Sequence, residues 1–146
     1  MTTAYSNLLG LALPVTGELS GTWGDTVNDY ITKYLDDAIA NAQIISGSQT
    51  AVTLSKTTGS SLVSAGSGAT GSAQYALIRC TGNPASTLTI TVSYSSLTNA
   101  QFSKTYLIFN STSTNQSVVV QATTSSGTST GVTITSGEKA LIAWNG

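Results

Sequence analysis

Few side chains in this sequence have the types and spacing that catalysis needs. Its 146 residues include no histidine and a single cysteine, so the usual general base, the Ser-His-Asp triad and most zinc or paired-cysteine sites are missing. Asp25 and Asp29 would share a helix face, but a solvated acidic face explains them without catalysis. We therefore predict that the protein is not an enzyme and needs no cofactor.

Two further groups of residues have both a functional and a structural interpretation. Cys80 ends the apolar run AlaLeuIleArgCys, and we expect it to be a small buried core residue. Several aromatic side chains could line a sugar-binding groove, which would suit a soluble carbohydrate-binding module, although core and turn packing is the interpretation we favour. These are Tyr94, Phe102, Tyr106, Phe109 and Trp144.

The composition favours a β-rich protein that belongs to an assembly. Only 8% of the residues are charged, whereas 25 are threonine and 22 are serine. Threonine favours strands, and serine with glycine favours turns. A surface so poor in charge is unusual for a free monomer. Five basic residues give no cationic patch for nucleic acid, and the lack of an 18-residue apolar run argues against membrane insertion.

The N-terminal part is predicted to be an extended arm followed by one helix. Pro14 and glycines at 10, 17 and 21 interrupt any regular element in residues 1–21. Residues 23–42 then show apolar side chains at helical spacing, with Thr22 as N-cap and Asp25 in a capping-box position. This stripe could pack on the rest of the chain or on symmetry mates. Its members are Val27, Ile31, Tyr34, Leu35, Ala38, Ile39 and Ala42.

From residue 44 the apolar pattern changes to a period of two, which predicts strands. We expect a mainly β fold, an antiparallel β-sandwich or barrel-like body, with 104–144 as a meander and a tight hairpin at 136–137. No repeat of fixed period is evident. The expected domains are 1–43 and 44–146. The expected strands are Ala51–Ser55, Gln74–Thr81, Thr87–Tyr94, Lys104–Asn110, Ser117–Thr123, Gly131–Thr135 and Glu138–Trp144.

Charge is divided unevenly between these two parts. Residues 1–43 carry a net charge of −4 and residues 44–146 a net charge of +3. The two parts are therefore expected to face different surroundings or partners.

Residues 11–28, LeuAlaLeuProValThrGlyGluLeuSerGlyThrTrpGlyAspThrValAsn, resemble a segment near the N-termini of tail-fibre and related virion proteins of tailed phages, especially marine and cyanobacterial ones. The C-terminal stretches 104–113 and 131–146 are similar to small β domains of the same class. Together the similarities cover about half the chain. The matching positions are Pro14, Thr16, Gly17, Gly21, Thr22, Trp23, Gly24, Asp25 and Asn28.

The resemblance implies a homotrimeric virion appendage whose N-terminal portion faces the particle. Its expected partners are a tail adaptor or nozzle protein or the capsid, with a host surface glycan as a further candidate. The chain is either a compact stand-alone member or the head-proximal part of a longer fibre. A capsid-surface decoration or spike protein is the alternative to a tail fibre, and a soluble carbohydrate-binding module is the third hypothesis.

Two sets of residues are the candidate interaction sites. Trp23, between two glycines, is either an aromatic anchor for another virion protein or a hydrophobic staple that folds back on its own arm. The candidate docking residues are Leu13, Pro14, Thr16, Gly17, Trp23, Gly24, Asp25 and Asn28. The candidate trimer contacts on the helix are Val27, Ile31, Tyr34, Leu35 and Ala38.

Overall fold

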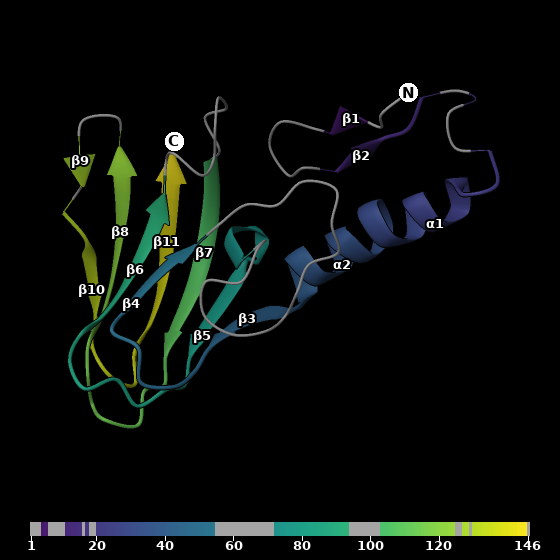
Figure 1. The fold of residues 1–146 in the computed structure, drawn as a ribbon. Coiled ribbons are helices and arrows are strands. Elements are labelled where there is room, and N and C mark those ends of the chain that lie inside the picture. The colour runs from purple at the N-terminus through teal and green to yellow at the C-terminus, as the bar shows by residue number, and fades with distance from the viewer. Residues whose placement is uncertain are drawn as a thin grey trace.

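A computed structural model describes residues 4–5, 11–15, 17, 20–54, 72–93, 103–124, 127–128 and 130–145. These residues form mostly strands, with few helices, so the predicted mainly β fold is confirmed (Figure 1). The elements are β1 (Ala4–Tyr5), β2 (Ala12–Leu13), α1 (Trp23–Val27), a π-helical turn (Asn28–Thr32), α2 (Lys33–Ala40), β3 (Ala42–Ile45), β4 (Ala51–Leu54), a 3₁₀ turn (Ser72–Gln74), β5 (Leu77–Cys80), β6 (Leu88–Ser93), β7 (Ser103–Asn110), β8 (Val118–Thr124), β9 (Gly127–Thr128), β10 (Val132–Ile134) and β11 (Lys139–Asn145).

Successive strands from β3 to β8 alternate between two sheets. One sheet has the order β11-β7-β5-β3, and the other has the order β10-β8-β6-β4, with β9 on β8. Within each sheet the neighbours from β3 to β8 are parallel. The predicted antiparallel arrangement is therefore wrong for most of the body. Alternating apolar residues identify a strand with one buried face, but they do not reveal the direction of its neighbour.

The C-terminal strands are also arranged differently from the prediction. β10 pairs antiparallel with β8, whereas β11 pairs antiparallel with β7 in the other sheet. The stretch 104–144 is therefore not a meander, and 136–137 is not a hairpin between paired strands. A tight turn does lie there: Gly137 has φ 83°, and the N–H of Glu138 donates to the carbonyl of Thr135 at 3.1 Å.

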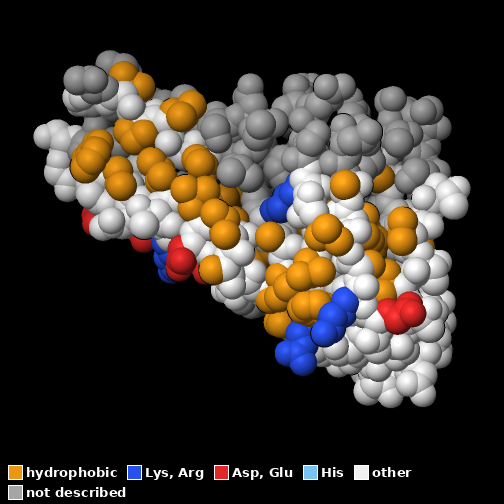
Figure 2. All heavy atoms as spheres, turned by 180° about the vertical axis from the view of Figure 1, so that it is seen from behind, with side chains coloured by type: hydrophobic (Ala, Val, Ile, Leu, Met, Phe, Trp, Pro, Cys, Tyr) orange, Lys and Arg blue, Asp and Glu red, His pale blue; other side chains and the backbone are white. Residues whose placement is uncertain are grey.

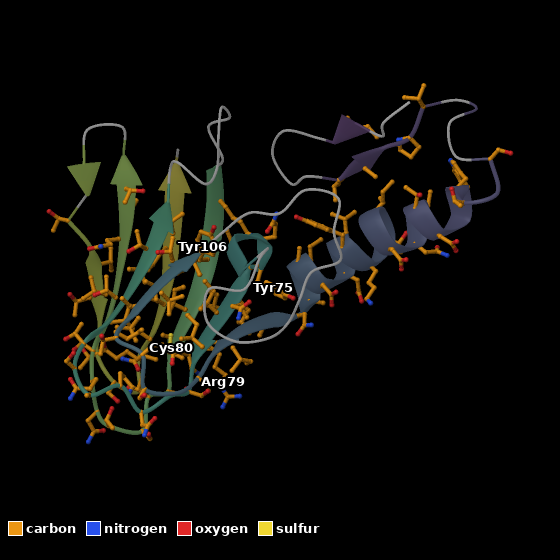
Figure 3. The ribbon with its side chains drawn as sticks, in the orientation of Figure 1. Tyr75, Arg79, Cys80 and Tyr106 are labelled. Carbon is orange, nitrogen blue, oxygen red and sulfur yellow. The ribbon has the colours of Figure 1, made fainter. Side chains whose placement is uncertain are left out.

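Side chains from both sheets share one hydrophobic core. The predicted buried face of β6, with Leu88, Ile90 and Val92, is confirmed, and Cys80 is fully buried as expected. Figure 3 shows Cys80 and Tyr106 between the sheets, whereas Arg79 points away from them. The remaining core members are Ile45, Val52, Leu54, Ala73, Ile78, Ile108, Val118, Val120 and Ile134.

The predicted helix is present but ends two residues early. It runs from Trp23 to Ala40 with the π-helical turn in its middle. Asn41 is extended, and its side-chain oxygen accepts a hydrogen bond from the N–H of Ala42 at 2.8 Å. This local bond lets the chain leave the helix and enter β3. The expected domain boundary at 43/44 therefore falls inside a strand. Thr22 occupies the N-cap position but makes no side-chain capping bond.

A second, smaller cluster connects the helix to the β body. Tyr34 and Ala38 of α2 are buried against Tyr75, which precedes β5, and Leu11 of the arm packs on them. Figure 3 shows Tyr75 at this junction. The helix is thus held at its C-terminal half, and α1 lies at the end remote from the two sheets (Figure 1). No helix in the described ranges is both long and apolar enough to cross a membrane.

Candidate docking surface

The described part of the N-terminal arm combines one buried strand residue with exposed apolar neighbours. β2 pairs antiparallel with β1, and Ala12 is only 3% exposed. The expectation that the arm forms no regular element is therefore corrected, since a short strand pair organises it. Leu13 and Val15 are each 49% exposed, and Pro14 between them is half-buried. Apolar side chains on this arm are consequently available to a partner.

Two glycines shape the chain between the arm and the helix. Gly17 and Gly21 have φ values of 81° and 86°, a region that other residues rarely adopt. No atom lies within 4 Å of the position of a β-carbon at either one. These glycines are required by backbone conformation, and the space around them is open. Thr16, which the sequence also places in this site, lies outside the described residues.

The first turn of the helix presents its candidate docking residues to solvent. Trp23 is 60% exposed, and Gly24, Asp25 and Asn28 are also exposed. Among the described residues Trp23 belongs to neither hydrophobic cluster. Asp25 lies in the first turn of α1, where a carboxylate is stabilised by the positive end of the helix dipole.

The apolar stripe of the helix divides into two faces. Tyr34 and Ala38 are buried within the chain and are not available to symmetry mates. Ile31 and Leu35 are half-buried and line a shallow groove together with Ile39, which is 72% exposed. Val27, one turn earlier, is half-buried as well. Part of the predicted contact surface therefore stabilises the protomer, and the rest forms an open apolar strip.

A second apolar surface, which the sequence reasoning missed, covers the outer face of the four-stranded sheet. Leu141 is 73% exposed there and Ile44 is 36% exposed. The signal was present in the consecutive apolar residues at 76–78, 106–109 and 140–143. A strand with only one buried face should alternate, so unbroken apolar runs indicate that both faces meet apolar surroundings.

The described part of the chain offers little machinery for catalysis. It contains no group of three or more carboxylate, cysteine or histidine side chains placed to hold a metal ion. Lys104 is the one strongly perturbed cation there, because burial lowers its pKa to about 8. Its ammonium donates to the carbonyl oxygens of Ala73 and Gln74, so it ties the 3₁₀ turn to β7.

Of the aromatic side chains considered as a sugar groove, the two that the structure describes, Tyr106 and Phe109, lie on opposite faces of β7. Tyr106 is buried, its hydroxyl donates to the carbonyl of Ala73 at 2.9 Å, and burial raises its pKa. Phe109 lies on the opposite face of the same strand, where the ammonium of Lys139 is 5.1 Å from its ring centre. Tyr94 and Phe102 lie outside the described residues, as does the side chain of Trp144. The described aromatic side chains therefore form no common groove.

Comparisons with protein-family models, with curated proteins and with solved structures found no match. The surfaces described above are thus the basis for a functional conclusion, together with the resemblance of residues 11–28.

Proposed function

We propose that the protein is a non-enzymatic structural subunit of a tailed-phage virion. In this proposal it is a homotrimeric tail-fibre or fibre-anchor protein that attaches to the tail and supports host recognition. Residues 11–28 dock onto another virion protein, and the β body projects outward. The observation that carries the proposal is the 60% exposure of Trp23. An exposed tryptophan leaves a large apolar side chain in contact with water, which is unfavourable unless a partner covers it.

Two features support this orientation. Leu13 and Val15 are exposed on the same segment, and aromatic residues with apolar neighbours are typical of interface hot spots. The helix extends from the sheets so that its first turn lies far from the β body (Figure 1). Docking at this end would leave the body free. The net charge of −4 on residues 1–43 suits a basic partner and would orient the approach.

The proposal is tested by replacing Trp23 in the phage that encodes the protein. Trp23→Ala should reduce incorporation into particles while the melting temperature of the purified protein stays unchanged, because Trp23 is 60% exposed and lies in neither hydrophobic cluster of the described residues. Loss of a hot-spot aromatic weakens binding by about 2 kcal/mol or more. Val132→Ala is the matched control, since Val132 is 50% exposed on β10 and lies outside the proposed segment.

A point substitution is a cleaner test than removal of the arm. Leu11 packs on the cluster of Tyr34, Ala38 and Tyr75, so deletion of residues 1–21 would also remove a core contact. An early melting transition with normal incorporation for Trp23→Ala would overturn the docking role. A map of the intact particle then gives the position: density on the tail supports the fibre proposal, and density only on the capsid surface overturns it.

A further inference from the structure

The outer face of the β3-β5-β7-β11 sheet carries two ordered rows of side chains. The strand register aligns Ala42, Leu77, Leu107 and Leu141 in one row across all four strands. The next row consists of Ile44, Arg79, Phe109 and Lys139. The first row is entirely apolar, and the second alternates apolar residues with cations. The sheet thus presents a flat apolar surface bordered by positive charge.

The other sheet has no such surface. Its outer face aligns Ala51, Thr89, Val119 and Thr133 in one row, and Thr53, Thr91 and Gln121 in the next. The amide of Gln121 donates to the hydroxyl of Thr91 at 3.2 Å, so these polar groups satisfy each other in the monomer. Of the two outer sheet faces in the described part of the chain, only that of β3-β5-β7-β11 has the composition of an interface core, which points to a partner on that side.

The open strip of the helix is similar in length to the apolar row of this sheet face. Ile31, Leu35 and Ile39 lie four residues apart along the helix and span about 12 Å at about 1.5 Å per residue. The apolar row of the sheet spans four strands, about 14 Å at about 4.8 Å per strand. The strip therefore matches the row in length.

The two surfaces also complement each other in charge. Asp36 borders the groove formed by Ile31, Leu35 and Ile39, whereas Arg79 and Lys139 border the sheet groove. Figure 2 shows hydrophobic side chains gathered along the helix and over the sheet on one side of the molecule, with mainly acidic groups beside the helix and mainly basic groups beside the sheet. One copy of the chain therefore carries both halves of a complementary contact.

We infer that the helix strip of one copy packs on the outer face of the β3-β5-β7-β11 sheet of a second copy, head to tail. Asp36 of each helix then lies near Arg79 and Lys139 of the neighbouring sheet. A head-to-tail contact closes into a ring when the rotation allows, and closure by three copies rests on the trimer in the proposed function. The subunits are thus joined by helix-on-sheet contacts rather than by a central bundle of helices.

The inference is tested on the purified full chain by light scattering and sedimentation at micromolar concentration. Ile39→Arg and Leu141→Arg each place a charge on one of the two surfaces, and each should convert the trimer to a monomer. Both side chains are more than 70% exposed, so folding should be retained, as far-ultraviolet circular dichroism would verify. Thr133→Arg, at an exposed position on the outer face of the other sheet, is the matched control and should remain trimeric.

Mixing the two disabled variants gives the decisive result. A Leu141→Arg copy keeps an intact helix strip, and an Ile39→Arg copy keeps an intact sheet face, so an equimolar mixture should form a one-to-one complex that neither variant forms alone. A helix bundle predicts instead that Leu141→Arg stays trimeric, and a sheet-to-sheet contact predicts that Ile39→Arg stays trimeric. Either result overturns the inference, as does a wild-type dimer.

Charge reversal tests the orientation of the contact. Asp36→Lys should weaken association about tenfold, because it faces two cations, and combining it with Arg79→Glu and Lys139→Glu in the same chain should restore association. Failure of this restoration overturns the placement of Asp36.

These measurements use the purified protein and need no particles, so they test the contact separately from the virion role. If the helix-on-sheet contact is disproved but the trimer still enters particles, the virion role stands. A confirmed contact in a protein absent from particles refutes that role alone.

Discussion

Gly82 lies directly against the backbone of Gly47, and a β-carbon on Gly82 would collide with the carbonyl oxygen of Gly47. The same carbonyl accepts a hydrogen bond from the N–H of Asn83 at 2.7 Å, and the carbonyl of Gly82 accepts one from the N–H of Ser113 at 3.0 Å. The connections β3–β4, β5–β6 and β7–β8 therefore stack on one another through their backbones. This stacking continues the parallel pairing of the strands beyond their ends.

Gly82→Ala should lower the free energy of unfolding by about 1–3 kcal/mol, the usual cost of forcing extra volume into a filled site. Urea denaturation of the purified protein measures it. The control is Gly24→Ala, where no atom lies within 4 Å and alanine in a helix is favoured by about 0.5–1 kcal/mol. Equal stability of the two variants would show that the stacked turns are not close-packed.

Asn110 fixes the connection after β7 through its side chain. Its amide nitrogen donates to the carbonyls of Gln116 and Ile134, each at 2.9 Å. Its amide oxygen accepts from the N–H of Thr112 at 3.2 Å and from the hydroxyl of Thr112 at 2.9 Å. A single buried amide thus satisfies backbone groups in the turn and at the end of β10.

Asn110→Asp should destabilise the protein by about 1–3 kcal/mol or more at neutral pH, because a carboxylate would replace a donor between two buried carbonyls. Thermal unfolding would measure the loss. Asn83→Asp is the control, since that side chain is exposed and should tolerate the change with little effect. A melting temperature for Asn110→Asp within error of the control would contradict the proposed network.

β6 was predictable because the residues of its buried face alternate with polar residues. Leu88, Ile90 and Val92 show this pattern in the sequence, and all three enter the core. β3 was missed because the apolar stripe of the helix runs on into Ala42 without a break. Only the local bond from the side chain of Asn41 to the next N–H separates helix from strand. Such a bond has no periodic signature.

Parallel pairing could not be predicted from these patterns. Ala42 aligns with Leu77, and Leu77 with Leu107, so the units are 35 and then 30 residues long. An unequal spacing hides the repeated strand pairs from any search for a fixed period. The exposed Trp23 was identified from its glycine neighbours, whereas the sheet face around Leu141 was not, because its apolar runs were interpreted as core alone.

Cys80 should be unreactive toward thiol reagents in the folded protein. It is fully buried in the hydrophobic core, and burial raises its pKa to about 12. The thiolate is the reactive form, so neither ionisation nor access favours modification. Labelling with a chromogenic disulfide at pH 8 should detect no thiol in native protein and one equivalent in denaturant, since the chain has a single cysteine. Rapid labelling without denaturant would contradict the burial.

Lys104 should give the protein a stability that rises with pH between about 8 and 10. Burial lowers its pKa to about 8 in the folded state, whereas an unfolded lysine titrates near about 10.4. Between these values the unfolded chain binds more protons than the folded one, so raising the pH favours folding. Below about pH 8 the folded state carries the full cost of a buried charge, and above about pH 10.4 the dependence ends.

The measurement compares the protein with Lys104→Met in urea titrations at pH 7 and pH 9.5. Cys80 and Tyr106 have raised pKa values, which lower stability at high pH, but both proteins keep them and their effect cancels in the difference. The stability of the Lys104 protein relative to Lys104→Met should increase from pH 7 to pH 9.5. Lys33→Met, at an exposed lysine on the helix, isolates the effect of burial. If the difference in the free energy of unfolding between the protein and Lys104→Met is the same at pH 7 and pH 9.5, the carbonyl groups of Ala73 and Gln74 that bind the Lys104 ammonium offset the effect of burial on its pKa.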